Sequence, residues 1–432
     1  MKKSTNTLQK TTFIHFYAHD NSRKLKDYDA QVFTQGYQNS FKSIKVGKDY
    51  EMATPENPFA LANEAFSKSI DSTGNYILPL IKLDYYSNNY QTEREKASFT
   101  QTSATYHSFI HRSEKLPLFW KEWRNLTYLK KIDNDTLPSF LAENEKAVDF
   151  IIEKARQNQV VMFNEAHFDP QHRLLVTHLL ADFYKEEFCF LALEGLGKHD
   201  TTINERGFVI QSSGFYTLEP AMADLIRQAH KRGFYIFGYD EYGKDREKKQ
   251  AKNIFEKTIA KDKDAKVLVF AGFGHISEKK AKTEKQRNMM AKEFELLSGI
   301  NPLTIDQVEY MNMSENNWLS IVDASTYNGG IEVDIKIANS FYKFPQEKRE
   351  IKYTFSDSVK TELDIEKTTY KGSLKVYNLE EWKITRKAVP FQVIAIQNEK
   401  SVNLSLKPNQ EYYIEIADPQ GSIIFEEILR IE

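Results

Sequence analysis

Short apolar runs alternate with segments of helical spacing between about residues 160 and 310. The apolar runs occupy residues 160–163, 188–193, 234–239, 266–271 and 303–308. Apolar residues recur every three or four positions in the segments between them, at residues 174–184, 220–231, 246–259 and 285–297. Continuous apolar runs are typical of strands buried on both faces, and their alternation with amphipathic helices is typical of βαβ units. We therefore predict an α/β fold, with a parallel sheet flanked by helices, over residues 158–317.

The chain on either side of this region has a different texture. Residues 1–57 are polar without a sustained period, which indicates an irregular lead-in, whereas residues 58–157 show helical spacing and predict a helical segment that packs on the core. Short, often alternating runs follow at residues 350–355, 373–377, 391–397, 402–406, 412–416 and 423–431. Turn sequences such as Lys407-Pro408-Asn409 separate them. This pattern predicts a connector and a small antiparallel β-sandwich within residues 318–432.

The composition is that of a globular protein and narrows its partners. Of 432 residues, 41% are hydrophobic, and 59 lysines and arginines nearly balance 61 aspartates and glutamates. The net charge of −2 gives no whole-chain field that would attract nucleic acid, so we expect a small-molecule ligand or substrate. No apolar run reaches the roughly 18 residues of a transmembrane helix. No clear signal peptide begins the sequence, so a cytoplasmic and an exported location both stay open, as does the oligomeric state.

Several well-known catalytic signatures are absent from the sequence. It has no Gly-x-Ser-x-Gly nucleophile elbow, no phosphate-binding loop, no dinucleotide fingerprint and no Cys-x-x-Cys pair. These absences argue against a serine hydrolase, a kinase and a dehydrogenase. The single cysteine, Cys189, lies inside the run 188–193, and we expect it to be buried in a strand.

Titratable residues follow four of the predicted strands. Glu165 and His167 follow the first, Glu194 the second, Asp240 the third and His275 the fourth. Catalytic groups and ligands gather at the carboxyl ends of parallel strands. Residues two apart in extended backbone also point the same way, so Glu165 and His167 can face one crevice. We therefore expect Glu165, His167, Glu194 and His275 to form one polar site.

Two histidines and two carboxylates suit two kinds of chemistry. One is proton transfer, in which a glutamate or a histidine polarises water. The other is the binding of a divalent metal by nitrogen and oxygen ligands, with Glu165, His167 and His275 as candidates. Each residue alone also has an ordinary role open to it, since Glu194 could cap a helix and His275 could face solvent. Their recurrence at successive strand ends favours a shared site.

At these positions the sequence resembles the superfamily that joins ChaN-like haem-binding proteins, erythromycin esterases and Tiki/TraB-type proteins. It is most similar to the ChaN-like motif, a Gly-Glu-x-His followed by Asp-Asn-Pro and further histidines. The residues with matching spacing are Glu165, His167, Pro170 and His172, with Arg173 where a second histidine is common.

Later elements of the same superfamily also have counterparts. Glu194 follows an apolar strand, and Gly274-His275 follows another. Arg246, Ala251 and Asn253 have the spacing of an Arg-Asp-x-x-Met-Ala-x-Asn element of the erythromycin esterases. The resemblance covers residues 158–317, and it implies that Glu165, His167, Glu194 and His275 are the active or binding residues.

Other residues are candidates for supporting roles. His172 and Arg173, at the start of the following helix, could bind an anionic group or orient a carboxylate, although a solvated helix start is an equal alternative. Since the resemblance includes haem-binding proteins, Tyr239 and Tyr242 are candidate phenolate ligands.

The sequence departs from the motif at two positions. Asn164 replaces the usual glycine and is expected to bring a side chain close to the site. Phe168 adds a bulky apolar group beside His167, which would favour a flat hydrophobic ligand.

Two functions follow from these residues. The first is a hydrolase in which Glu165 and either His167 or His275 activate water, with or without a divalent metal, while Glu194 and Arg246 orient the reacting groups. The second is a haem- or metal-binding protein without turnover. A non-catalytic interaction module that retains the site as a relic is a third reading.

Overall fold

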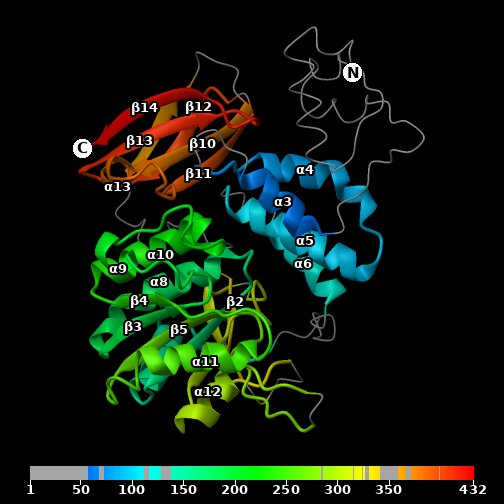
Figure 1. Ribbon diagram of the computed structural model, residues 1–432, viewed down its shortest axis with the longest axis vertical. Helices are drawn as coiled ribbons and strands as arrows, with labels where there is room; N and C mark the ends of the chain where they lie inside the picture. The colour runs from blue at the N-terminus through cyan, green and yellow to red at the C-terminus, as the bar shows by residue number, and fades with distance from the viewer. Residues whose placement is uncertain are drawn as a thin grey trace.

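An eight-stranded sheet, counted over the residues that the structure describes, forms the centre of the α/β part of the molecule (Figure 1). The computed structural model describes residues 57–67, 73–110, 116–127, 138–283, 286–314, 316–323, 325, 330–340, 359–365, 371–397 and 399–432. The strand order is β1-β7-β8-β6-β2-β5-β3-β4. The parallel strands are β2 (Val160–Glu165), β3 (Phe188–Leu193), β4 (Tyr235–Gly238), β5 (Lys266–Gly272), β6 (Leu303–Asp306) and β8 (Ile335–Asn339). The predicted parallel sheet is confirmed.

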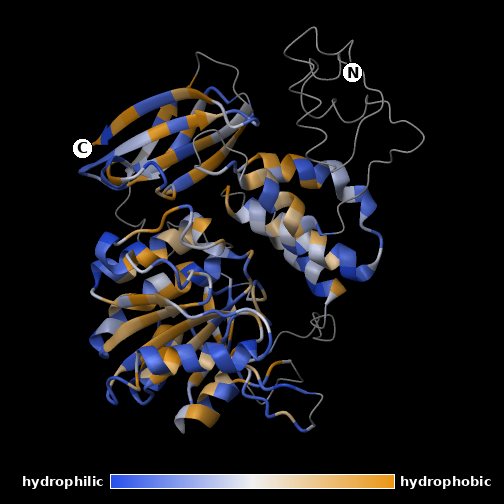
Figure 2. Cartoon of the chain, in the orientation of Figure 1, coloured by the Kyte–Doolittle hydropathy of each residue, from blue (hydrophilic) through white to orange (hydrophobic). Residues whose placement is uncertain are grey.

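Helices cover both faces of this sheet, as the alternation of side chains along buried strands requires. On one face, strand residues such as Val161 and Phe270 share a core with α7 (Glu145–Arg156), α8 (Pro170–Lys185) and α10 (Pro220–Lys231). On the other face, Met162 and Val269 pack with α11 (Arg246–Lys257) and α12 (Met290–Ser298). The central strands are hydrophobic, and α11 turns a hydrophilic surface outward (Figure 2).

The sheet extends beyond the range 158–317 on both sides. β1 (Phe140–Glu143) and β7 (Leu319–Val322) pair antiparallel, and β7 joins β8. These strands were not predicted because they are short and because Ser320 and Lys336 interrupt their apolar pattern, although both side chains are buried.

The predicted helical segment is present and lies over the loops that follow the strands. Its helices are α3 (Pro58–Ser67), α4 (Leu78–Tyr86), α5 (Glu93–Ser108) and α6 (Leu116–Leu126). Phe109 of this segment packs on Phe215 after β3, with ring centroids 5.5 Å apart. Trp123 packs on Phe168 after β2 and on Phe273 after β5, at 5.4 and 5.3 Å. The segment therefore covers the carboxyl end of the sheet.

The C-terminal part is antiparallel, as predicted. A four-stranded sheet contains β11 (Gln392–Gln397), β10 (Lys371–Asn378), β13 (Gln410–Ala417) and β14 (Ile423–Ile431), and a two-stranded sheet contains β12 (Ser401–Leu406) and β9 (Val359–Asp364). Leu374, Ile414 and Leu404 belong to a core that the two sheets share, which makes them a sandwich. The short helix α13 (Leu379–Ile384) follows β10.

Further expectations concern the ends of the chain, its cysteine and its helices. Of the predicted lead-in at residues 1–57, residues 1–56 lie outside the described residues, as does the predicted run 350–355. Cys189 is exposed rather than buried, because the register of β3 against β5 shifts between Phe188 and Phe190, and Cys189 falls at this irregularity. None of the helices in the described part of the chain has the length and apolarity to cross a lipid bilayer.

Candidate active site

The candidate site lies at the carboxyl ends of three adjacent strands, β2, β5 and β3. The register of β2 and β5 pairs Glu165 with Gly272, and the backbone N–H of Glu194, directly after β3, donates to the carbonyl of Phe270 at 3.1 Å. The backbone thereby sets the two glutamates on either side of the end of β5. All four residues predicted from the strand ends, Glu165, His167, Glu194 and His275, come together here.

Gly272 is the point at which the two halves of the site meet. A Cβ atom on Gly272 would lie 2.4 Å from His167 Nε2 and 3.2 Å from Glu194 Oε2. The Gly272 N–H also donates to Glu194 Oε2 at 2.5 Å. Only glycine permits this approach, so the end of β5 forms the floor between His167 and Glu194.

Glu165 and His167 form a dyad. Glu165 Oε1 lies 2.8 Å from His167 Nδ1, and both carboxylate oxygens accept from Arg173, at 2.7 and 2.9 Å. Burial alone would raise the pKa of Glu165, but the charge of Arg173 and the hydrogen bonds from His167 and Arg173 outweigh it and lower that pKa. The ionised carboxylate therefore accepts a hydrogen bond from Nδ1, which leaves Nε2 as the ring nitrogen that can take part in proton transfer.

Aromatic rings hold the His167 imidazole in place. The ring of Tyr216 stacks on it, with centroids 4.0 Å apart and planes 18° apart. Phe273 meets it edge to face at 4.9 Å. Tyr216, Phe273 and the hydrogen bond between Nδ1 and Glu165 thus fix the orientation of the imidazole.

Arg173 orients the dyad from beneath. Its fully buried guanidinium also donates to Glu219 Oε2 at 2.8 Å and to the carbonyl of His167 at 2.9 Å. Of the two predicted roles, the structure therefore shows the orienting of a carboxylate, because no face of this group is left for an external anion. Glu219 in turn caps α10 by accepting from Ala221 and Met222.

His275 belongs to a second dyad, with Glu247. Its Nδ1 lies 2.7 Å from Glu247 Oε2, and its Nε2 lies 3.4 Å from Glu194 Oε1. Burial alone would lower the pKa of His275, but hydrogen bonds with Glu194 and Glu247 and their charges raise it to about 9. At neutral pH the ring is therefore an imidazolium.

Arg246 lies between the second dyad and the sheet. It donates to both oxygens of Asp240 at 2.9 Å and to Glu194 Oε1 at 2.7 Å. Its Nη1 lies 3.2 Å from His275 Nε2. A neutral ring accepts in that contact, whereas a protonated ring donates from Nε2 to Glu194, so His275 has a partner in either state.

Glu194 is charged in this setting. Burial would raise its pKa, but the hydrogen bond with His275 and the charge of His275 hold that pKa well below its usual range. The carboxylate thus serves as the anionic centre around which both histidines and Arg246 are arranged.

The remaining predicted residues do not contribute atoms to the site. Burial lowers the pKa of His172 to about 3, and its Nδ1 accepts from the backbone N–H of Ala166 at 3.0 Å, so it supports the loop. Tyr239 is fully buried and donates to the carbonyl of Phe270 at 3.2 Å. Tyr242 is 83% exposed, with Arg246 6.0 Å from its ring centre. As haem ligands, Tyr239 is therefore inaccessible and Tyr242 lies outside the enclosed cluster.

The two departures from the motif both point away from the dyads. Asn164 does not crowd the site, because neighbouring strand residues face opposite ways. Its amide donates to the carbonyl of Phe273 at 2.8 Å and to Asp306 at 2.5 Å, and its Oδ1 accepts from Gln307. Phe168 is buried against Trp123 and is not available to a ligand.

The donor set does not suit the predicted metal. Glu165 is occupied by Arg173, Glu194 by Arg246, and His275 Nδ1 by Glu247. A cation would also have to share the site with the Arg246 guanidinium, which costs Coulomb energy. Among the described residues, no group of three or more histidine, cysteine, aspartate or glutamate side chains is arranged to hold a metal ion.

Several site residues were not identified from the sequence. Asp240 was noted at the end of the third predicted strand but was not included in the site, and Glu247 directly follows Arg246, so both could have been found by asking which acids neighbour a candidate. Tyr216 gave no signal except the aromatic pair that it forms with Phe215 in the long connection after β3. Glu219 could have been recognised as a helix cap, because it precedes Pro220.

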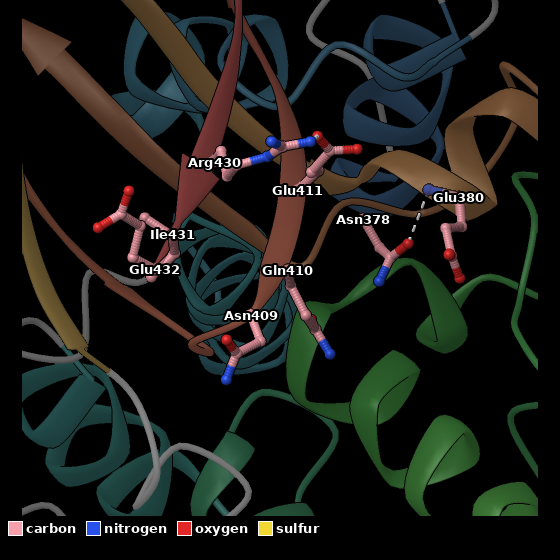
Figure 3. Close-up of a pocket in the computed structure, with 8 residues that line it drawn as sticks. All are labelled: Asn378, Glu380, Asn409, Gln410, Glu411, Arg430, Ile431 and Glu432. Atoms are coloured by element: carbon pink, nitrogen blue, oxygen red, sulfur yellow. Dashed lines mark hydrogen bonds and ion pairs between the residues drawn. The ribbon is translucent and has the colours of Figure 1, made fainter.

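A second hollow, in the C-terminal sandwich, is unlike this site. It measures about 650 Å³, and its lining includes the exposed pair Arg430 and Glu411 (Figure 3). Asn378, also in its wall, accepts from the backbone N–H of Glu380 at 2.9 Å and caps α13. None of the described residues that line it is a histidine, and its charged groups are solvated, so it lacks the dyads of the strand-end site.

Comparisons with known proteins place few limits on this chain. No protein-family model and no curated protein matches it. Among solved structures, that of the type III effector HopBA1 is similar, with 18% sequence identity and a TM-score of 0.33 over 46% of this chain and 96% of the other. A similarity at this level assigns neither a family nor an activity.

Proposed function

We propose that the protein is a hydrolase in which His167, held by Glu165, takes a proton from water. The observation that carries this proposal is the dyad itself. The carboxylate of Glu165 accepts a hydrogen bond from Nδ1 of His167, and Arg173 keeps that carboxylate ionised. Nε2 of His167 lies against the backbone of Gly272, beside Glu194. An imidazole whose Nδ1 is held by an ionised carboxylate, with Nε2 directed toward a polar neighbour, is the arrangement of a general base.

The proposed reaction is the hydrolysis of an ester or an amide. His167 Nε2 removes a proton from water, and the water oxygen attacks the carbonyl carbon. The tetrahedral intermediate then breaks its bond to the leaving group, which receives the proton from His167, so an acid and an alcohol or amine are released. No step requires a metal ion, in keeping with the occupied donors.

His275 and Arg246 are assigned a different part. Both are cationic at neutral pH and both contact Glu194, which holds them on one wall of the crevice. Fixed positive groups stabilise the negative charge that a carbonyl oxygen gains during attack. We assign the proton transfer to His167 alone and the electrostatic role to His275, which separates two functions that the sequence left interchangeable.

Variants of the dyad test the proposal. With chromogenic p-nitrophenyl esters and anilides, we expect Glu165→Gln and His167→Gln to lower kcat/KM by roughly 10²- to 10⁴-fold, the usual contribution of a general base. His230→Gln is a matched control, because His230 lies at the far end of α10 and contacts the carbonyl of Asn204. An unchanged kcat/KM in Glu165→Gln would show that the proposed role is wrong.

The second function, haem binding without turnover, has one observation in its favour. The free His167 Nε2 lies beside the rings of Tyr216 and Phe273, which could contact a flat ligand. If the protein hydrolyses none of the esters and anilides but binds haemin saturably, this second function replaces the first.

A further inference from the structure

An apolar cavity adjoins the His167 side of the candidate site. Its volume is about 500 Å³, within the range of small-molecule pockets. It lies between helices α5 and α6 on one side and the turn after β5 on the other. Its lining includes Ala97, Gln101, Trp123, Phe273, Gly274 and Met289.

Phe273 is the wall that the cavity shares with the candidate site. Its ring meets His167 edge to face at 4.9 Å and lies 5.3 Å from the ring of Trp123. Gly274, the next residue, lines the cavity and directly precedes His275. The cavity is therefore next to both dyads: Phe273 contacts His167, and Gly274 precedes His275 in the chain.

The backbone at this wall is constrained. Phe273 has a φ of +42°, which a residue with a bulky side chain rarely adopts. Such a conformation persists only where the surroundings impose it, and it is common beside functional sites. Here the ring is held between His167 and Trp123.

The cavity is open above Gly274. A Cβ atom placed there would meet only the terminal methyl of Met289, at 3.9 Å, and no positive φ is recorded for this glycine. Room for a ligand group is therefore present next to the backbone that carries His275.

The chemistry of the lining selects the occupant. None of the described residues that line the cavity carries a charge. Trp123, Phe273 and Met289 supply most of the apolar surface, whereas the polar groups in the lining are the uncharged side chains of Gln101, Ser98, Thr127 and Ser277. Such a lining favours a hydrocarbon group and disfavours a phosphate or carboxylate, which would lose its hydration without gaining an ionic partner.

We propose that the substrate carries a hydrocarbon group of several carbons, and that this group fills the cavity while the scissile carbonyl lies beside His167. This inference rests on the proposed hydrolase function for the scissile bond, but the cavity and its occupant can be tested without turnover.

A chain-length series tests the substrate class. We expect kcat/KM of the wild type to be at least tenfold higher for p-nitrophenyl octanoate than for p-nitrophenyl acetate, because each added methylene enters an apolar pocket. Ala97→Phe, which fills the cavity from α5, should abolish that preference. Lys96→Phe, at an exposed neighbouring position of the same helix, is the matched control and should keep it. Equal preferences in the wild type and Ala97→Phe would overturn the inference.

A binding measurement separates this inference from the hydrolase proposal. The probe is 2-decanone, a ketone that cannot be hydrolysed, with acetone as its short counterpart, and the readout is tryptophan emission. We expect a saturable change with 2-decanone only, lost in Trp123→Phe and in Ala97→Phe. If that change is seen while no ester is hydrolysed, the cavity assignment stands and the hydrolase proposal fails. If esters are hydrolysed without a chain-length preference and 2-decanone gives no signal, the reverse holds.

Discussion

Among single residues, His275 has an environment that makes the stability of the protein depend on pH. Its pKa is raised from 6.5 to about 9, so the folded protein binds this proton more tightly than the unfolded chain does. The resulting stabilisation is fully present below about pH 6.5 and is lost as the pH rises through about 9. At about 1.4 kcal/mol for each pKa unit, the shift is worth about 3 kcal/mol.

We therefore expect the free energy of unfolding of the wild type to fall by about 3 kcal/mol more than that of His275→Gln between pH 6.5 and 9.5. Urea denaturation at both pH values measures the difference. Parallel losses in the two proteins would contradict the assignment of this proton to His275.

Some residues of the site could be predicted from the sequence because strand ends were recognisable. Glu165, His167, Glu194 and His275 each follow an apolar run directly or within a few positions. Tyr239 was predicted as a candidate ligand, but it lies two positions after Phe237 and therefore points to the same side of the sheet. Both side chains are buried in the same core. The stacking of Tyr216 on His167 could not be predicted, because the two residues are far apart in the sequence and no local pattern links them.

At the scale of elements, two helices begin at the site and are joined there. Asp169 caps α8 and Glu219 caps α10, while Arg173 in the first turn of α8 reaches across to Glu219. The position of Glu165 therefore depends on where α10 starts. Burial leaves neither Arg173 nor Glu219 a water to replace a lost partner.

Two variants of Glu219 separate its two contacts. Glu219→Gln keeps an oxygen for the cap but removes the ionic partner of Arg173, and we expect it to cost about 3 kcal/mol of stability. Glu219→Ala also removes the cap and should cost about 1 kcal/mol more. Equilibrium unfolding in urea gives both values. A Gln variant as stable as the wild type would show that the buried ion pair is dispensable.

The elements that the sequence predicted are those long enough to show a clear apolar pattern. The runs at 188–193 and 423–431 coincide with β3 and β14, and the helical spacing at 220–231 coincides with α10. β8 was not predicted because it is short and Lys336 is its second residue, yet this lysine is buried and pairs with Glu309. In the sequence, a lysine of this kind indicates an exposed position. Its burial can be explained only once its partner, which is 27 positions away, is known.

At the scale of the whole molecule, the sandwich and the helical segment both contact the long connection that joins β3 to α10. On the sandwich side, the N–H of Val389 donates to the carbonyl of Val209, and Gln211 donates to the carbonyl of Lys387. On the other side, Phe109 packs on Phe215, which directly precedes Tyr216. The residue that stacks on His167 is thus positioned by both appended parts.

One ion pair joins the sandwich to α10. Arg227 donates to both oxygens of Glu381 in α13 at 2.7 Å, and both side chains are largely buried. Removal of one partner leaves the other charge buried, so Glu381→Ala should lower the free energy of unfolding by about 3 kcal/mol. Glu380→Ala, at the exposed neighbouring position, should change it by less than about 0.5 kcal/mol. Urea denaturation of the two variants tests this link, which equal values would refute.

The amide of Asn164 has a consequence for the order in which the protein can assemble. Its partners, Phe273, Asp306 and Gln307, leave the ribosome more than a hundred residues after it does. Strand β2 likewise lies between β5 and β6, both of which are made later. A growing chain therefore carries Glu165 and His167 long before their crevice has walls. The centre of the sheet closes only after residue 307, so the Glu165–His167 dyad is synthesised well before the rest of its site and is among the last parts to be enclosed.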